Sequence, residues 1–154
     1  MPNTLLSRTK TVHYVCAALL LILLVMQFTP FWSIDSGSVS IGGYIWFPSD
    51  HTDLTSHLQD TLGADFTINN ILAPCLLMLV LSAVGAVMSV IKAATVIPSL
   101  LSAACGVSGF IGFLTTPALR LGTMWWFQLI LCVAQIACGV YALYLATQRS
   151  QETA

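Results

Sequence analysis

Charged side chains are the scarcest class in this sequence, at 7% of its 154 residues, while apolar residues make up 57%. A soluble domain carries about 25% charged residues, which cover the surface that faces water. The formal net charge is −1, and no cluster of Lys and Arg is present that could follow a nucleic-acid backbone. The shortage of charge therefore excludes nucleic acid as a partner and favours a chain that faces lipid.

Catalytic and cofactor motifs are missing as well. The sequence contains no GxSxG, HExxH, Walker or dinucleotide-binding glycine pattern. Its five cysteines form no CxxC pair, and none lies in the polar segment 33–69. A disulfide framework needs cysteines in an oxidising compartment, so we interpret these as small buried apolar side chains. We predict no enzyme activity and no cofactor.

Four apolar stretches are long enough to cross a bilayer, which takes about 20 residues. They cover 14–31, 70–91, 96–114 and 124–146, and none has Lys, Arg, Asp or Glu in its interior. The first stretch is longer than the roughly 7–15 apolar residues of a signal peptide and ends without a small-residue cleavage site. We therefore predict a single domain with an all-α fold, a bundle of four transmembrane helices that retains the first one.

The placement of basic residues predicts the orientation. Arg8 and Lys10 precede the first span, Lys92 lies between the second and third, and Arg149 follows the fourth. With an even number of spans these four share one side, which the positive-inside rule makes cytoplasmic. Arg120 is the exception, and five of the six acidic residues fall in the first outer loop. We predict a multi-pass protein of the plasma or inner membrane with both termini in the cytoplasm.

The outer segment 33–69 contains a hairpin pattern. Ser38-Val39-Ser40-Ile41 alternates with period two, Gly42-Gly43 follows, and Tyr44-Ile45-Trp46-Phe47 is a second β-prone run. Two such runs around a two-residue glycine loop predict a β-hairpin, because the favoured turns need positive φ. A lone hairpin is marginally stable in water, so the face that carries Tyr44 and Trp46 is expected to contact another surface.

A short amphipathic helix is expected after this hairpin. Leu54, Leu58 and Leu62 repeat every four residues, Ser49 or Asp50 is suited to the N-cap, and Gly63 is suited to the C-cap. The leucine stripe needs a cover, so Leu54 and Leu58 join Tyr44 and Trp46 as predicted contact residues of the outer loop.

Histidines and carboxylates cluster on the same helix, at His51, Asp53, His57 and Asp60. Asp53, His57 and Asp60 are helical neighbours, but His51 faces away from His57. A divalent metal needs ligands that converge on one point. We expect solvated surface pairs here, and a metal site stays open as an alternative.

Small and polar residues follow defined faces of the last three spans. The fourth span carries Gln128, Cys132, Gln135 and Gly139 on one stripe; the second carries Ser82 and Gly85, and the third carries Gly106 and Gly109. Helices in lipid associate through close packing of small residues and interhelical hydrogen bonds. We predict that the last three spans pack tightly and that more of the leucine-rich first span is left to lipid or a partner.

Two kinds of polar contact are expected inside the bundle. Gln27 and Gln128 lie at a similar depth near the outer surface and could hydrogen-bond, while Gln135 and Ser82 lie near the midplane. These side chains either stabilise the bundle or line a path for a solute. No span contains Asp, Glu, Lys or Arg, and His13 at the inner edge of the first span has no facing histidine. This argues against proton relays, ion coupling and haem ligation by two histidines.

Four spans, cytoplasmic termini and a large first outer loop with β-structure resemble the plan of claudin-type tetraspan proteins. In that family a tryptophan follows the first span and a Gly-Leu-Trp motif comes later; Trp32 and Gly43-Tyr44-Ile45-Trp46 are similar to these. The paired loop cysteines of the family have no counterpart here. The resemblance therefore implies the topology alone.

Two functional hypotheses follow. The first is a non-enzymatic accessory or scaffold subunit of a larger membrane complex, with the lipid bilayer and another membrane protein or a second copy as partners. The alternative is a small homo-oligomeric channel or facilitator for an uncharged solute or ion, with the stripe of Gln128, Cys132, Gln135 and Gly139 at its pore.

Overall fold

The computed structural model describes residues 2–34, 37–40, 56, 59–60, 63, 69–114 and 123–152. Its long helices are α1 (Pro2–Met26), α4 (Asn69–Ile91), α5 (Val96–Leu114) and α6 (Thr123–Glu152). Each contains a stretch long and apolar enough to cross a membrane. Helices suit these sequences because the hydrocarbon core offers no water to the backbone, and a helix satisfies its own N–H and C=O groups. The chain is a multi-pass membrane protein with a helical bundle.

The limits of α4 and α5 agree with the predicted spans, whereas α1 begins before residue 14 and α6 continues beyond residue 146, so both helices are longer than predicted at the end that carries the termini. α1 ends at Met26, whereas the predicted span continued to Phe31. The N–H groups of Gln27, Phe28 and Thr29 bond to carbonyls three residues back, so the last turn tightens. Pro30 then begins a strand, because proline has no N–H with which to continue a helix.

The described strands form one short antiparallel pair, β1 (Pro30–Ile34) and β2 (Gly37–Ser40), in which Trp32 lies opposite Val39. The predicted hairpin through Gly42-Gly43 is not supported, because the strand that contains Ser38 pairs with the residues before it. The aromatic and β-branched residues of β1 favour an extended backbone, and only two residues separate β1 from β2. Residues 41–55, which include the rest of that prediction, lie outside the described residues.

The short helix of the outer loop is described at a few positions only. Ser56, Gln59 and Asp60 are helical. Gly63 has a φ of 103°, and its N–H donates to the Gln59 carbonyl oxygen at 2.9 Å. This is the left-handed C-cap predicted for Gly63, which suits glycine because it has no Cβ.

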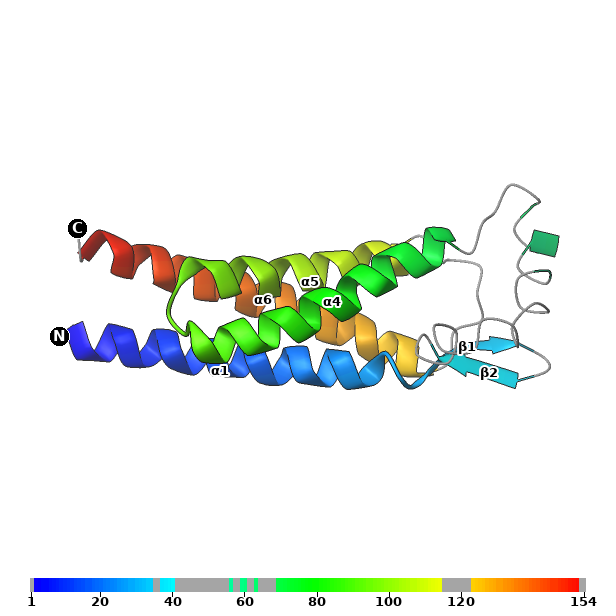
Figure 1. Cartoon of the computed structure of the whole chain (residues 1–154), viewed down its shortest axis with the longest axis horizontal. Helices are drawn as coiled ribbons and strands as arrows, with labels where there is room; N and C mark the ends of the chain where they lie inside the picture. Colours follow the sequence, from blue (N-terminus) through cyan, green and yellow to red (C-terminus); the bar gives the residue numbers. More distant parts are fainter. Residues whose placement is uncertain are drawn as a thin grey trace.

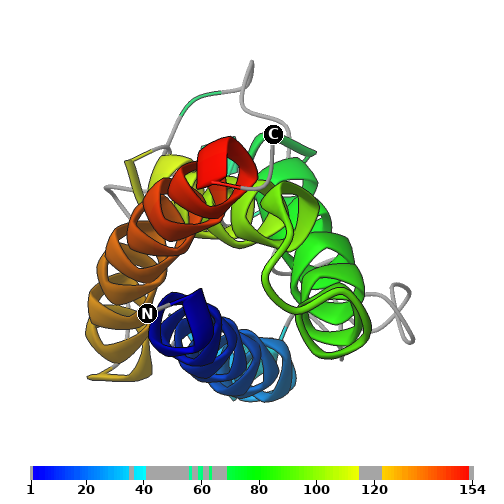
Figure 2. The same cartoon turned by 90° about the vertical axis from the view of Figure 1, so that its left-hand side faces the viewer.

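The four long helices form a ring of antiparallel neighbours. Both termini and the turn between α4 and α5 lie at one end of the bundle, and the β1–β2 pair lies at the other (Figure 1). Seen from the end that carries the termini, α1 is flanked by α4 and α6, and α5 lies across the bundle from it (Figure 2). The termini share one side, as an even number of spans requires.

The core includes α1, contrary to the prediction that more of this helix than of the others is left to lipid or a partner. The span in α1 is 39% buried, against 28% for the span in α4. Leu20 and Leu23 are fully buried. A Cβ added at Gly85 of α4 would lie 3.0 Å from Leu20 Cδ1, so the leucine fills the hole that the glycine leaves. The prediction was wrong because it counted small residues on α1 alone, and large side chains pack well against small ones on a neighbour.

Candidate functional site

The stripe of Gln128, Cys132, Gln135 and Gly139, called the α6 seam from here on, faces α5 within the same chain. All four seam residues are buried, together with Gly106 and Gly109 of α5. A Cβ added at Gly139 would lie 2.6 Å from the Ala103 backbone nitrogen, and one added at Gly106 would lie 2.8 Å from the Cys132 carbonyl oxygen. The two backbones therefore touch at two levels, as close packing of membrane helices through small residues allows.

Gln135 is the central polar residue of the α6 seam. It is fully buried, and its Nε2 donates a hydrogen bond to Ser102 Oγ of α5. The Oε1 of Gln135 finds no donor among the residues that the structure describes. Ser82, expected at the same depth, donates instead to the Leu79 carbonyl oxygen of its own helix at 2.9 Å. Gln135 thus joins α5 to α6, whereas the bond that Ser82 donates stays within α4.

Sulfur atoms from three helices meet beside the seam. Cys132 Sγ lies 3.9 Å from Met78 Sδ, and the Cys105 thiol lies 3.6 Å from the Met78 carbonyl oxygen. A Cβ at Gly109 would lie 2.6 Å from Met78 Sδ, so this glycine makes the space for the thioether. Among the described residues no three His, Cys, Asp or Glu side chains converge as a metal site would require.

Gln27 and Gln128 do not form the expected hydrogen bond. The Nε2 of Gln27 donates to the Leu23 carbonyl oxygen at 2.9 Å, one turn back in α1. The Nε2 of Gln128 points to Met78 Sδ at 3.7 Å, a weak acceptor. Both Oε1 atoms are buried and find no donor in the described part of the chain. Gln27 bonds within its own helix because a carbonyl one turn back is within reach of a helical side chain, whereas Gln128 is directed toward α4.

His13 is a polar contact that the sequence analysis missed. It is fully buried, with Nδ1 2.8 Å from the Thr9 carbonyl oxygen. Its Nε2 lies 3.1 Å from the Thr95 carbonyl oxygen and 3.0 Å from Ser99 Oγ. The imidazole therefore ties α1 to the start of α5. A sequence signal existed, since Thr9 and His13 are one turn apart, but the Thr95 carbonyl belongs to a turn that no pattern on α1 reveals.

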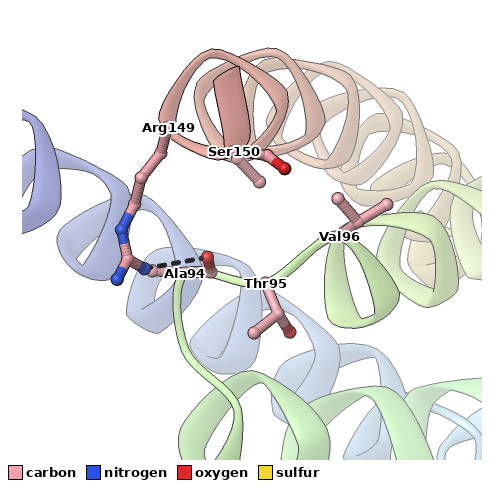
Figure 3. A pocket seen from close by; sticks show the side chains of 6 residues that line it. Ala94, Thr95, Val96, Arg149 and Ser150 are labelled. Carbon is pink, nitrogen blue, oxygen red and sulfur yellow. Dashed lines mark hydrogen bonds between the residues drawn. The ribbon is translucent and has the colours of Figure 1, made fainter. Parts of the chain in front are cut away.

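The α4–α5 turn is held from both sides. The Thr95 hydroxyl, directly before α5, donates to the Lys92 carbonyl oxygen at 2.8 Å. Ala94 has a φ of 72°, a left-handed conformation that is uncommon without glycine. Arg149 of α6 donates through Nη1 to the Ala94 carbonyl oxygen at 3.2 Å (Figure 3). The turn is therefore fixed to α6 as well as to α1.

The outward faces of the helices are apolar. The exposed side chains on these faces include Val25 on α1, Val84 on α4 and Val133 on α6. Tyr14 and Tyr144 are also more than half exposed. Their place toward the end that carries the termini fits the aromatic belt of a membrane surface.

The predicted contact residues of the outer loop are outside the part of the chain that the structure describes. These are Tyr44, Trp46, Leu54 and Leu58. The same holds for His51, Asp53 and His57, while Asp60 is described and exposed. The outer surface and the metal alternative therefore remain sequence predictions.

Comparison with models of protein families, with curated proteins and with solved structures finds no match to this chain. Its function is therefore argued from its own residues.

Proposed function

We propose that this chain is a non-enzymatic membrane protein that acts by contact, as an accessory or scaffold subunit of a larger membrane complex. The observation that supports this most directly is that polar and apolar side chains lie on different faces of the helices. Its small and polar side chains, such as Gln135 and Gly139, lie in contacts within the chain, and its outward faces are apolar. A surface of this kind can bind lipid or the helices of another membrane protein.

The orientation is part of the proposal. Arg8, Lys10, Lys92 and Arg149 belong to the end of the bundle that carries both termini (Figure 1). The positive-inside rule then places this end in the cytoplasm, in a plasma or inner membrane. The outer loop, with Tyr44, Trp46, Leu54 and Leu58, would offer a second contact surface on the opposite side.

A tryptophan scan of three matched valines tests the proposal. Val25, Val84 and Val133 lie on the outward faces of α1, α4 and α6, so Trp at each adds the same bulk. The full chain is solubilised in a mild detergent and its mass is measured by light scattering, together with in-membrane cross-linking. We expect a mass above the 16.6 kDa of one chain, and loss of that association for one face while the other two variants behave as wild type.

A stable monomer with no cross-linked species for wild type and all three variants would contradict a function by contact. Equal loss for all three variants would also contradict it, because a specific interface occupies one face and not the whole circumference.

A channel or facilitator for an uncharged solute or ion is the second candidate. The buried Oε1 atoms of Gln27, Gln128 and Gln135 favour it, because each is an acceptor without a donor among the described residues. The α6 seam faces α5 of its own chain, so a path along the seam would run through the bundle and not between copies.

Solute flux separates the two candidates. Purified protein in liposomes is tested with a panel of small neutral solutes and monovalent ions, with Gln135→Leu as the variant. Flux that is lost in Gln135→Leu, while the mass of the assembly is unchanged, supports the channel. No flux above empty liposomes for the whole panel contradicts it.

A further inference from the structure

The end of the bundle that carries the termini is strongly basic. Arg8, Lys10, Lys92 and Arg149 all belong to it, and among the residues described at this end Glu152 is the sole carboxylate side chain. The candidate spans end here, at Ile91 and Gln151, so these residues lie at the level of the lipid headgroups. Basic residues at that level attract anionic lipids.

A pocket opens at this basic end, between the α4–α5 turn and the last turns of α6. Its volume is about 250 Å³, several times the roughly 30 Å³ that a water molecule occupies in the liquid. It is lined by Ala94, Thr95, Val96, Ala146, Arg149 and Ser150. Figure 3 shows Arg149 and Ser150 of α6 on one side of the space, with Ala94, Thr95 and Val96 on the other.

Arg149 is held at the wall of this pocket. Its Nη1 donates to the Ala94 carbonyl oxygen at 3.2 Å, and Ala94 is buried and fixed in the turn. A guanidinium carries five N–H donors in a planar fork, which matches the oxygens of a phosphate group. The bond to the turn thus keeps the positive charge of Arg149 at the wall of the pocket.

The remaining walls suit a phosphate that is attached to an apolar group. Ser150 supplies a hydroxyl, while Ala94, Val96 and Ala146 supply methyl groups. Val96 begins α5, which continues from the pocket into the membrane as an apolar helix. A phospholipid has the same arrangement, with its phosphate at the surface and its acyl chains alongside the helices.

We propose that this pocket binds the phosphate group of an anionic phospholipid, with Arg149 as the charged side chain that contacts it. A free phosphate ion shares the chemistry, but the apolar walls and the position at the ends of the spans favour the lipid. The proposal does not depend on which side of the membrane is cytoplasmic, and it stands apart from the function proposed above.

Titration of the full chain in detergent with defined lipids, followed by native mass spectrometry, tests the proposal. The probes are phosphatidylglycerol, phosphatidylcholine and inorganic phosphate. Arg149→Gln is expected to weaken phosphatidylglycerol binding about tenfold, because charge-assisted bonds to phosphate are among the strongest in proteins. Lys10→Gln is the matched control, since it removes the same charge from an exposed α1 side chain at the same end. It should change binding less than about twofold.

Ser150→Leu is the second variant, because it keeps Arg149 and fills the pocket from an exposed position on α6. It should reduce phosphatidylglycerol binding even if Arg149→Gln lowers the stability of the fold. Stronger binding of phosphatidylglycerol than of phosphatidylcholine, without displacement by inorganic phosphate, supports the lipid. Displacement of phosphatidylglycerol by millimolar inorganic phosphate would overturn the lipid assignment and show that the pocket binds a soluble phosphate.

Equal losses for Arg149→Gln and Lys10→Gln, with no effect of Ser150→Leu, would overturn the proposal, because binding would then follow the overall charge of this end and not the pocket.

Discussion

At the scale of single residues, Ala94 shows how a short turn is kept in an unfavourable conformation. A left-handed backbone costs an L-residue about 1–2 kcal/mol, which glycine avoids. Ala94 nevertheless has a φ of 72°, because Lys92–Thr95 must reverse the chain between two packed helices. The bond from Arg149 to its carbonyl oxygen stabilises this turn.

We therefore expect Ala94→Gly to raise the free energy of unfolding by about 0.5 kcal/mol, after the entropy that glycine costs is subtracted. Ala94→Val should lower it by about 1–2 kcal/mol, because a β-branched side chain is more strained at positive φ. Thermal unfolding in detergent measures both. Ala93, the preceding residue in the same turn, has no positive φ, so Ala93→Gly should not stabilise the protein. Stabilisation by both glycines would show that strain at Ala94 is not the cause.

His13 is a second residue whose position matters more than the sequence alone indicates. Its Nδ1 lies within hydrogen-bond distance of the Thr9 carbonyl oxygen, and its Nε2 lies within hydrogen-bond distance of the Thr95 carbonyl oxygen and of Ser99 Oγ across the α1–α5 contact. His13→Ala should lower the free energy of unfolding by about 1–3 kcal/mol, because it leaves a cavity and removes an interhelical bond.

Ser99→Ala should cost less than His13→Ala, since the imidazole keeps its packing and the contact of Nδ1 with the Thr9 carbonyl oxygen. Val15→Ala is the control, because Val15 lies two residues away and is 46% exposed. The free energies of unfolding of the three variants are measured in the same detergent and compared. A cost for His13→Ala no larger than that for Val15→Ala would contradict the structural role of the imidazole.

At the scale of helices, the α5–α6 contact depends on glycines that allow the backbones to touch. A methyl group at Gly139 would lie 2.6 Å from the Ala103 nitrogen and 2.9 Å from its Cα, both backbone atoms that cannot move aside alone. At Gly112 the nearest atom would be Pro74 Cβ at 3.5 Å, an ordinary contact.

Gly139→Ala should therefore lower the free energy of unfolding by about 1–3 kcal/mol, because the helices must separate. Gly112→Ala is the matched variant and should be neutral or stabilising by about 0.5–1 kcal/mol, the gain in helix propensity of Ala over Gly. The two substitutions add the same methyl group to buried positions of neighbouring helices. Equal effects would show that the distance to the facing backbone does not decide the cost.

The helices could be predicted from the sequence, and several of their contacts could not. An uncharged apolar run in lipid has one solution, a helix, so the limits of α4 and α5 followed from the run itself. The partner of Gln135 was found only in the structure, because Ser102 and Ser82 lie at similar depths on different helices. Depth can be counted along a helix, but the rotation of one helix against another depends on side-chain packing.

At the scale of the whole molecule, the ring of four helices explains why the contribution of α1 was underestimated. Each helix in a ring has two neighbours, and α1 packs against both α4 and α6. A helix with few small residues can still be central when its neighbours leave space for its large side chains, as Gly85 does for Leu20. The number of small residues on one span therefore does not measure its burial.

The orientation of the protein in the membrane is also a property of the whole molecule. Both termini lie at one end of the bundle and the β1–β2 pair lies at the other (Figure 1), and Ser56 follows β2 in the sequence. Ser7, Ser56 and Gln151 are all exposed, so each can be replaced by Cys without disturbing the core. The native cysteines are buried or half-buried and serve as the background.

A membrane-impermeant maleimide should label Ser56→Cys in intact cells, and Ser7→Cys and Gln151→Cys only after the membrane is permeabilised. The expectation follows from the four basic residues near the termini, since basic residues are retained on the cytoplasmic side. Wild-type protein under both conditions gives the background labelling. Labelling of Ser7→Cys and Gln151→Cys in intact cells, with Ser56→Cys protected, would reverse the orientation while leaving the bundle unchanged. Labelling of one terminus but not the other would contradict the four spans themselves, because an even number of spans places both termini on one side.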